Sequence, residues 1–474
     1  MKTATLSTRQ VVRVLGKGIR LNGHANDPVQ GITYDPGAVL PGSIYVALSR
    51  PEGDGHDHVA EAVARGAQVV VTERMGWLPR RAVAVRVTDS RRALARIAAR
   101  YYGEPARRLQ IVGVTGPGSA EVAFYLRQLW AAAGRPVGLI GALGHELGDR
   151  LLPGRDGAEE PSDVQHMLAC LVEQGIGRCV LELGSAALER SITEEVPLAT
   201  LIRLGGETPP GVTAGELISI SWERGLAPGI RLVSGRWQGA PLWQVELARA
   251  SRDGWTLRLQ TGRGPMDCTL AVCGQQNMRA ALQAGMAARA LGVPAGAVRD
   301  GWSRLVSAPG RCEPIRRGQP FGVWVDGADS PAALQEVLAD ARRTAARRLL
   351  VLVGGSAWQA ADELTGLGAA AGRLAEVVMV TSNNPMEQPP EALIRPVSRA
   401  ARKAGARRVE EEPDRDRAIR RLLGQAEAGD LVLLTGKGRR TTMELAYVRV
   451  PFDDRRRAWV ALGELGWTAG DSRS

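Results

Sequence analysis

The chain has 474 residues, an apolar fraction of 44% and a formal charge of +11. At about 150 residues per domain, this length predicts roughly three domains, each large enough to bury its own core. No apolar run approaches the ~18 residues that span a bilayer, and the start lacks an apolar signal core, which argues against a secreted or membrane-spanning protein and favours a cytoplasmic one.

Arginine supplies nearly all of the positive charge, with 57 arginines against four lysines and no lysine between Lys17 and Lys403. Arginine doublets are spread along the chain, and aromatic residues make up only 4%. Few rings remain to stack on bases, so the composition argues against a nucleic-acid partner, although binding of a polyanion stays an alternative. The five cysteines are odd in number and lack C-x-x-C spacing, which predicts reduced, buried thiols without metal or disulfide.

In the first block, residues 1–107, short extended runs alternate with helical runs. The extended runs are Gly31 to Tyr34, Ser43 to Leu48, Ala67 to Val71 and Val83 to Val87, and the helical runs are His58 to Arg65 and Arg91 to Tyr102. Asp54, His56, Asp57 and His58 offer metal-type ligands within five residues, but we favour a loop that enters the helix, with Asp57 as its N-cap.

The middle block, residues 108–308, reads as a parallel α/β sheet followed by an antiparallel patch. Its parallel strands are predicted at Leu109 to Val112, Pro136 to Gly141, Arg178 to Leu183 and Leu198 to Leu204, with a helix at Val122 to Ala133. The antiparallel strands are predicted at Pro241 to Ala250, Trp255 to Gln260 and Cys268 to Val272, before a helix from Gln275 to Leu291.

The third block, residues 309–474, alternates again and predicts a doubly wound, Rossmann-like sheet. Its strands are predicted at Val323 to Asp326, Leu349 to Gly354, Val377 to Thr381 and Leu431 to Leu434. Its helices are predicted at Pro331 to Arg347, Ala361 to Leu374, Pro390 to Ala404 and Asp414 to Ala426.

A glycine loop opens the middle block in the strand, loop, helix order of a phosphate-binding P-loop. It reads Gly113-Val114-Thr115-Gly116-Pro117-Gly118-Ser119-Ala120-Glu121. Ala120 stands where the phosphate lysine belongs, and Glu121 stands where a hydroxyl would reach magnesium. The loop has therefore lost one cation and gained one anion.

The ordered set of motifs resembles the Mur ligase family, and within it the tripeptide synthetases of peptidoglycan precursor synthesis. The resemblance extends over about 400 residues and rests on collinear order. Its segments are Val39 to Leu48, Gly113 to Gly116, Leu181 to Leu188, Pro309 to Glu313, Val325 to Pro331, Asn383 to Pro385 and Gly429 to Gly438. It implies a UDP-binding-like first domain, an ATPase-like central domain and a C-terminal ligase domain.

Departures from the family pattern fall where its chemistry would be. In the family, a carbamylated lysine holds a second magnesium ion. This lysine has no counterpart here, because the middle block contains no lysine, and only Glu182 remains of that metal site. The substrate turn becomes Glu159-Glu160-Pro161-Ser162, the histidine after Ser185 becomes Ala186, and the histidine of the Asp326 motif becomes Asp329. In the amino-acid clamp an arginine becomes Met386, and the last motif ends in Arg439-Arg440.

The resemblance leaves a set of vestigial site residues. The catalytic candidates are Glu182, Ser185 and Arg311; Glu182 is also the one metal candidate. The ATP-site candidates are Thr115, Gly116, Gly118, Ser119, Ala120, Glu121, Asn277, Arg311 and Asp326, and the substrate candidates are Asp35, Asn384, Pro385, Gly436 and Lys437.

Each surviving residue also has a structural interpretation. Gly113 and Gly116 would form the tight turn, Glu182 would pair with an arginine, and Lys437 would be a solvated turn lysine. Arg311 would make an interdomain ion pair or a nucleotide contact. His145, His166 and Ser185 show no spacing of a hydrolase triad.

We therefore expect a Mur ligase homologue that has lost ATP-dependent ligation and acts as a binding or scaffold partner. Its partner would be a catalytic Mur ligase or another cell-wall synthesis protein, with a UDP-muramyl-peptide as an alternative ligand. No cofactor is expected, and ATP with Mg²⁺ enters only if other residues rescue the site. The alternative is an active acid–amino acid ligase with an altered site, in which an arginine replaces the loop lysine.

Overall fold

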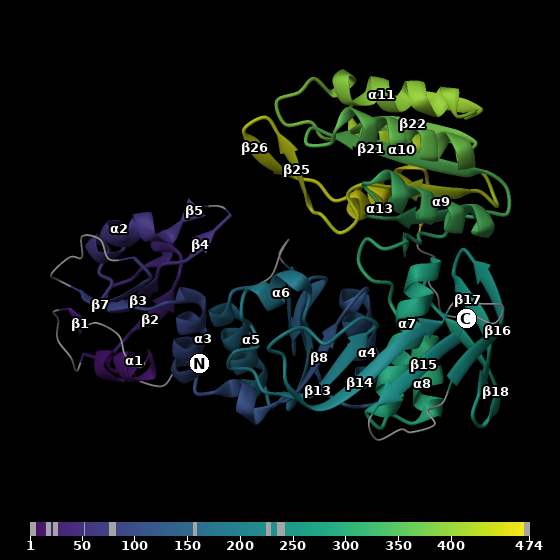
Figure 1. The fold of residues 1–474 in the computed structure, drawn as a ribbon. Coiled ribbons are helices and arrows are strands. Elements are labelled where there is room, and N and C mark those ends of the chain that lie inside the picture. The colour runs from purple at the N-terminus through teal and green to yellow at the C-terminus, as the bar shows by residue number, and fades with distance from the viewer. Residues whose placement is uncertain are drawn as a thin grey trace. The chain divides into compact units, whose positions relative to one another are not determined.

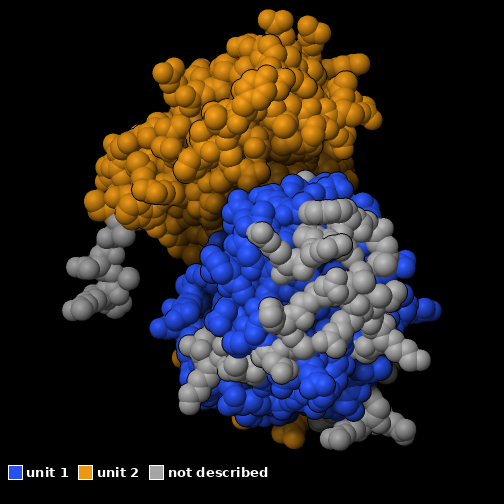
Figure 2. All heavy atoms as spheres, turned by 90° about the vertical axis from the view of Figure 1, so that its left-hand side faces the viewer, with its two compact units in different colours: residues 1–221, 231–240, 286–292 blue, residues 222–230, 241–285, 293–474 orange. Residues whose placement is uncertain are grey.

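The computed structural model describes residues 6–15, 20–21, 27–51, 53–74, 82–154, 159–223, 229–234 and 242–468. The chain forms two compact units (Figure 2). The first contains Met1–Ser221, Arg231–Ala240 and Met286–Gly292, and the second contains Trp222–Ile230, Pro241–Gly285 and Val293–Ser474. The first block and the middle block up to residue 221 thus belong to the same compact unit. The domain boundaries expected at residues 107/108 and 308/309 stay predictions.

The first unit begins with a five-stranded sheet in the order β1-β7-β6-β3-β2. The strands are β1 (Arg20–Leu21), β2 (Gly31–Thr33), β3 (Ser43–Val46), β6 (Val69–Thr72) and β7 (Val83–Arg86), with a small hairpin of β4 (Ser49–Arg50) and β5 (Gly53–Asp54) beside them. The helices are α1 (Thr8–Leu15), α2 (Val59–Ala64) and α3 (Ser90–Tyr101). β2, β3, β6 and β7 pair in parallel, and β3 is buried along its whole length, as expected for parallel strands covered on both faces.

The same unit contains a second, mainly parallel sheet with its own core. It is the first part of an eleven-stranded order, β11-β10-β9-β12-β8-β13-β14-β15-β16-β17-β18. The strands are β8 (Gln110–Thr115), β9 (Gly138–Gly141), β10 (Gly144–Leu147), β11 (Arg150–Leu152), β12 (Arg178–Glu182), β13 (Leu198–Leu204) and β14 (Ala214–Glu223), and the helices are α4 (Ser119–Ala132), α5 (Pro161–Glu173) and α6 (Ser185–Glu189). β9, β12, β8, β13 and β14 run in parallel, so the carboxyl ends of β8 and β12 meet at one edge.

The second unit includes an antiparallel meander next to a helical pair. The elements are β16 (Leu242–Ser251), β17 (Gly254–Thr261), β18 (Gly264–Leu270), α7 (Gln275–Ala290) and α8 (Ala295–Trp302). The last residues of α7, from Met286, and most of β15 (Gly229–Ser234), from Arg231, are assigned to the first unit. Trp302 fixes α8 against α7, because its indole N–H donates to the Ala281 carbonyl at 2.9 Å. Gly285 makes room for this ring, since a Cβ there would lie 2.2 Å from Trp302 Cζ2.

The rest of the second unit is a six-stranded sheet in the order β19-β20-β24-β21-β22-β23. Figure 1 labels its strands β21 and β22 together with the helices α9, α10, α11 and α13. The strands are β19 (Glu313–Pro314), β20 (Gly322–Val325), β21 (Leu349–Ser356), β22 (Val377–Asn384), β23 (Arg408–Glu411) and β24 (Leu431–Leu434). The helices are α9 (Pro331–Thr344), α10 (Ala361–Leu374), α11 (Pro390–Lys403), α12 (Arg415–Leu423) and α13 (Asp454–Glu464), and a hairpin of β25 (Thr442–Leu445) and β26 (Val448–Pro451) precedes α13.

Alternation along β21 explains why this sheet is covered on both faces. Leu349 and Val351 pack with α9, α10 and α11, whereas Leu350 and Leu352 pack with α12 and α13. Successive strand residues point to opposite faces, so a continuous apolar run needs helices on both sides. The predicted fold class, α/β with a central parallel sheet, an antiparallel patch and a C-terminal doubly wound sheet, is confirmed.

Among the described residues, no helix is long and apolar enough to cross a membrane. The five cysteines are free and buried, as predicted. The N-cap prediction at Asp57 was wrong: Asp54 caps the 3₁₀ turn Gly55–His58 by accepting from the His56 N–H, and Asp57 lies inside that turn.

Candidate functional site

The loop between β8 and α4 has the backbone of a phosphate-binding turn. Gly116 has a φ of +103°, and Gly118, the N-cap of α4, has a φ of +79°. A side chain at Gly116 is excluded because its Cβ would lie 2.6 Å from the carbonyl oxygen of Leu204. Gly113 does not belong to the turn, contrary to the prediction. It lies inside β8, where a Cβ would approach Leu183 Cδ1 to 2.9 Å.

The first turn of α4 carries no cation. The helix begins at Ser119, three residues earlier than predicted, so Ser119, Ala120 and Glu121 form its first turn. A helix N-terminus attracts negative charge, and here Glu121 supplies a carboxylate from the chain itself. The turn retains the helix dipole of an anion site without the ammonium that would bind a triphosphate.

Glu182, at the end of β12, bonds with the glycine-loop helix. Its Oε1 accepts from Ser119 Oγ at 3.3 Å, and its Oε2 accepts from the Ala142 N–H at 2.6 Å. Thr115 Oγ1 donates to the Leu183 carbonyl at 2.9 Å. The structure thus brings together the predicted site residues Thr115, Ser119 and Glu182. Their hydrogen bonds to one another and to the backbone hold the ends of β8 and β12 in place.

The described residues do not assemble a dedicated metal centre. They contain no group of three His, Cys, Asp or Glu side chains placed to hold an ion. Mg²⁺ in nucleotide sites uses one or two carboxylates together with phosphate oxygens and water. Each oxygen of Glu182 accepts one of these two hydrogen bonds and keeps a second lone pair, so Glu182 could supply one carboxylate ligand to Mg²⁺ in such a site.

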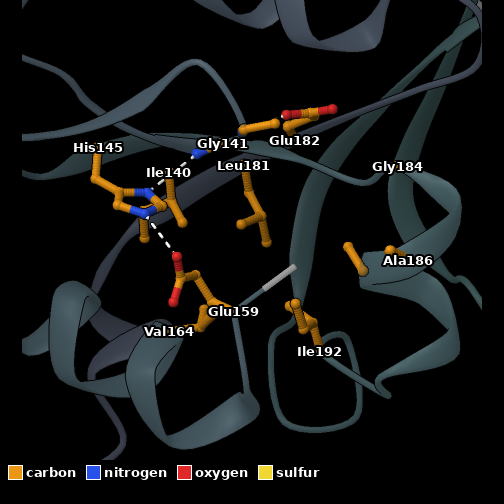
Figure 3. A pocket seen from close by; sticks show the side chains of 12 residues that line it. Ile140, Gly141, His145, Glu159, Val164, Leu181, Glu182, Gly184, Ala186 and Ile192 are labelled. Carbon is orange, nitrogen blue, oxygen red and sulfur yellow. Dashed lines mark hydrogen bonds and ion pairs between the residues drawn. The ribbon is translucent and has the colours of Figure 1, made fainter. Parts of the chain in front are cut away.

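A cavity of about 60 Å³ adjoins Glu182 (Figure 3). Its walls are mainly apolar and are formed by Ile140, Gly141, Ala142, His145, Glu159, Val164, Leu181, Glu182, Gly184, Ala186, Ala187 and Ile192. His145 and Glu159, both buried, pair at 3.0 Å through Nε2 and Oε1. His145 Nδ1 accepts from the Gly141 N–H at 3.3 Å, so in the neutral ring Nε2 carries the proton and donates to Glu159.

Glu160, which the sequence places in the altered turn, is the N-cap of α5 and has partners that sequence reasoning did not identify. Its carboxylate accepts from Arg91 Nε at 3.0 Å and from a terminal nitrogen of Arg190 at 3.1 Å. Nearby, Tyr34 donates to Asp163 Oδ2 at 2.7 Å. No local signal marks these partners, because Arg91 lies 69 residues before Glu160.

Asp35, predicted to contact a ligand, caps a turn. Its Oδ1 accepts from the Gly37 N–H at 2.8 Å, at the start of the 3₁₀ turn Pro36–Ala38. In the Asp54–His58 cluster, His56 Nδ1 lies 2.6 Å from Asp54 Oδ1, and its Nε2 accepts from the Glu73 N–H at 3.2 Å. Asp35, Asp54 and His56 thus each have a structural role in holding a turn or a neighbouring strand end.

Lys437 is buried at the carboxyl edge of the C-terminal sheet, contrary to the solvated interpretation. It is 2% exposed, and its Nζ donates to the Thr442 carbonyl at 2.7 Å and to Asn384 Oδ1 at 3.4 Å. Burial, followed by the nearby Arg415 guanidinium, lowers the pKa of Lys437 to about 7. Asn384 Oδ1 also accepts from the Glu444 N–H at 3.0 Å, so the predicted pair Asn384 and Lys437 anchors the β25–β26 hairpin.

The residues at the family's amino-acid clamp, Pro385 and Met386, lie next to the same β25–β26 hairpin. Gly436 has a φ of +100° and donates from its N–H to the Asp326 carbonyl at 3.1 Å. Met386, after Pro385, has a φ of +50° and exchanges backbone hydrogen bonds with Glu444 and Ala446. Met386 is partly exposed and offers no guanidinium to a substrate carboxylate.

Asp326 and Asn277 organise the backbone around the residue that follows Arg311. Asp326 Oδ2 accepts from the Cys312 N–H and Oδ1 from the Ala328 N–H, each at 2.8 Å, and burial raises the pKa of this carboxyl. Asn277 Nδ2 donates to the Arg311 carbonyl at 2.6 Å. The Arg311 residue itself is exposed. The structure therefore gathers these three predicted residues.

Arg415 and Asp454 form a buried ion pair that sequence reasoning missed. Both side chains are 0% exposed; Arg415 Nε lies 2.8 Å from Asp454 Oδ1, and a terminal nitrogen donates to the Thr435 carbonyl at 2.7 Å. Asp454 opens α13, an element absent from the predictions. Besides burial, both members of the pair act on Lys437: the Arg415 guanidinium lowers the pKa of the lysine, and the Asp454 carboxylate raises it.

Two remaining candidates show no catalytic arrangement. Ser185 begins α6, and His166 stacks on Tyr102 with ring centroids 5.4 Å apart. His145 is engaged with Glu159 and Gly141.

Residues 310–438 match the model of the Mur ligase, glutamate ligase domain. A protein of Roseiflexus sp. (strain RS-1), named UDP-N-acetylmuramyl-tripeptide synthetase, is 30% identical over 93% of this chain and 96% of its own. A Geobacillus thermodenitrificans protein named UDP-N-acetylmuramoyl-L-alanyl-D-glutamate–2,6-diaminopimelate ligase is 29% identical over 98% of this chain and 100% of its own.

A solved structure of a UDP-N-acetylmuramoyl-L-alanyl-D-glutamate–2,6-diaminopimelate ligase superposes with a TM-score of 0.62 at 20% identity. It covers 98% of this chain and 100% of the solved one, and at this identity the likeness bears on the fold. The motif order of the sequence agrees with the 30% identity to a relative over 93% of the chain, with the matched C-terminal domain and with the shared fold. The chain belongs to the Mur ligase family.

Proposed function

We propose that this Mur ligase homologue serves peptidoglycan precursor synthesis as a binding or scaffold protein without ATP-dependent ligation. The observation that carries the proposal is the glycine loop. Its turn persists, but Ala120 and Glu121 replace the ammonium and the hydroxyl, and Ser119 bonds to Glu182. Phosphoryl transfer depends on positioned cations, and the positions that would carry them in this loop are neutral or acidic.

Substitutions in the other pockets support the same proposal. Glu160 places a carboxylate between two arginines in the altered substrate turn, and Met386 replaces the clamp arginine. An acidic substrate would find two arginines already paired with Glu160 at the first place and one donor fewer at the second. The proposed partner is a catalytic, lysine-containing Mur ligase, and the proposed location is the cytoplasm.

An active acid–amino acid ligase is the second candidate, and the names of the relatives favour it. The Roseiflexus and Geobacillus proteins are named as a synthetase and a ligase and align over nearly the whole chain. In this case an arginine replaces the loop lysine, and Glu182 turns towards Mg²⁺. This candidate predicts Mg-ATP hydrolysis that disappears in Glu182→Ala.

The test is a ligation assay with a UDP-N-acetylmuramoyl-dipeptide, Mg-ATP and a mixture of amino acids, with products followed by mass spectrometry. The scaffold proposal expects no tripeptide product and no phosphate release above background. A tripeptide product that depends on Glu182 would establish the ligase instead. Co-purification with the organism's lysine-containing Mur ligase would support the scaffold role.

A further inference from the structure

Helix α11 has one side in the core of the C-terminal sheet and the other side in solvent. Leu393 and Val397 belong to the core that covers this face of the sheet. The helix packs closely on α10, where a Cβ added at Gly368 would lie 2.1 Å from the Val397 carbonyl oxygen, and one at Gly372 would lie 2.3 Å from that of Ala401. In Figure 1, α11 lies at the outer margin of the second unit. Its polar side is therefore a surface of that unit.

The polar side of α11 is strongly basic. The exposed cations of the helix and of the turn after it are Arg395, Arg399, Arg402, Lys403, Arg407 and Arg408. Residues four apart on a helix lie on the same side, so Arg395, Arg399 and Lys403 form one row. The single acid of the helix, Glu391, lies in the first turn, at the other end from Lys403. Arg373, also exposed, adds a cation where α10 contacts the end of α11.

Most of these cations lack the ion pairs that the chain makes elsewhere. Within the described residues, no carboxylate pairs with a set of five cations that we call the basic face: Arg373, Arg395, Arg399, Lys403 and Arg407. Arg402 and Arg408 differ from them, since they pair with Glu411 and Glu410. The basic face thus presents five positive charges to solvent.

The opposite face of the same sheet shows arginines with structural partners. On α12, Arg420 Nε lies 3.1 Å from Asp416 Oδ2, and Arg421 Nε lies 2.7 Å from Glu410 Oε2. A high arginine content alone would give both faces the same pattern of pairing. The charges of the basic face are unbalanced within the chain, and they fit an anionic partner from outside it.

The composition of the segment narrows the kind of partner. Residues 390–408, all of which the structure describes, contain no aromatic residue and expose no large apolar side chain. Single-stranded nucleic acids bind through stacked rings, and protein interfaces bind through buried aromatic or apolar anchors. Neither is available here, whereas an extended layer of negative charges needs only cations. The surface of an anionic bilayer has this chemistry.

We propose that the basic face holds this chain on the surface of a bilayer of anionic phospholipids. Clusters of about four to eight Lys or Arg residues beside a membrane are attracted to anionic headgroups, and each residue adds to the attraction. The apolar side of α11 stays in the core, so the contact is electrostatic and inserts no side chain. The proposal concerns a different surface from the glycine loop and holds whether or not the chain ligates.

The experiment is flotation of the full chain with vesicles of phosphatidylcholine, with and without phosphatidylglycerol. The wild type should float with the phosphatidylglycerol vesicles, stay unbound with phosphatidylcholine alone, and detach as sodium chloride screens the charges. The triple variant Arg395→Gln, Arg399→Gln, Lys403→Gln neutralises three members of the basic face. Its apparent affinity for the anionic vesicles should fall about 100-fold.

Two control variants separate a local site from an effect of net charge. Arg258, Arg299 and Arg316 are exposed, and each pairs with an aspartate. Changing all three to glutamine removes the same charge from another part of the unit and should leave most of the affinity. A variant with Arg395→Lys and Arg399→Lys keeps the charge of the basic face and should bind as the wild type does.

The proposal is wrong if the wild type does not float with the anionic vesicles. It is also wrong if the two glutamine triples lose affinity equally, because net charge would then explain the binding. If the Arg395 triple does not fold, Arg395→Gln and Arg399→Gln must each weaken flotation as single changes, and unchanged flotation overturns the proposal.

Duplex DNA offered in place of vesicles gives the remaining outcome. Affinity for DNA that depends on the basic face, without flotation, would assign the surface to nucleic acid and overturn the membrane contact. The ligation assay contains no vesicles, so its result decides the proposed function and leaves the membrane contact to the flotation experiment.

Discussion

Two glycine loops, one in each compact unit, have the same backbone pattern and opposite electrostatics. In the first, Gly116 and Gly118 have φ values of +103° and +79° around Pro117; in the second, Gly436 and Gly438 have +100° and +52° around Lys437. Both loops follow a parallel, buried strand. Pro117 is exposed, however, whereas Lys437 is buried and bonded to neighbouring elements. Glycine geometry thus persists whether or not a cation remains.

The difference separates what holds a loop in shape from what binds an anion. The first loop is held by close backbone approach and by Glu182, which accepts from Ser119. The second adds the buried Arg415–Asp454 pair, so charge contributes to the structure there, and it adds Lys437, whose Nζ contributes hydrogen bonds. Substitutions that break the Arg415–Asp454 pair should therefore damage the second site.

The largest expected effect comes from breaking the buried pair. Arg415→Met leaves Asp454 charged, buried and without this partner, which costs about 3–5 kcal/mol of the free energy of unfolding. Urea denaturation followed by circular dichroism measures the change. Arg258→Met, which breaks the exposed Arg258–Asp267 pair of the same unit, serves as the control and should leave the midpoint unaltered.

The next effect is a pH dependence from Lys437. Its pKa falls from 10.5 to about 7 on folding, so between these pH values the unfolded chain binds a proton that the folded chain lacks. Stability therefore rises with pH across this window, by about 1.4 kcal/mol per unit, and the penalty is complete below pH 7. Lys437→Met should remove this slope from the stability profile. Identical slopes in both proteins would refute the buried, uncharged lysine.

A cation restored to the first loop should sharpen the comparison. In Ala120→Lys with Glu121→Thr, one ammonium and one hydroxyl return to the first turn of α4. A charge-assisted contact is worth roughly 1.5–3 kcal/mol, so Mg-ATP affinity should increase about 10- to 100-fold over the wild type. Ala120→Met with Glu121→Thr controls for size and lost negative charge; equal affinities of the two double variants would show that the missing ammonium is not the cause.

The smallest effect distinguishes the two glycines of the first loop. Gly118→Ala has open space and should cost about 1 kcal/mol for its left-handed backbone. Gly116→Ala adds a Cβ only 2.6 Å from the Leu204 carbonyl oxygen, so the backbone must move and the cost should exceed that of Gly118→Ala by about 1–3 kcal/mol. Equal unfolding midpoints of the two variants would contradict the close approach seen at Gly116.

Much of the fold followed from the sequence, because apolar runs and loop residues are local signals. The helix predicted from Gln275 to Leu291 spans Gln275–Ala290, and the strand predicted from Leu349 to Gly354 spans Leu349–Ser356. Two elements escaped: α5 begins after Glu160 instead of a serine or threonine cap, and the strands of the β25–β26 hairpin are only four residues long. The helix predicted to end at Arg347 ends at Thr344.

The site was predictable where it depends on residue type and hidden where it depends on tertiary contacts. The missing lysine at Ala120 is visible in the sequence, and so is the extra acid at Glu121. The burial of Lys437 is not, since a lysine between two glycines ordinarily points to solvent. The Arg91–Glu160 contact joins residues 69 apart, and no spacing rule connects them.

Isothermal titration of the wild-type chain with Mg-ATP at moderate salt tests the central claim most directly. The account predicts no saturable heat up to millimolar nucleotide, because the first turn of α4 offers Ala120 and Glu121 where a cation and a hydroxyl are needed. Saturable binding in the micromolar range would contradict the account and establish that other residues of the chain supply the missing charge.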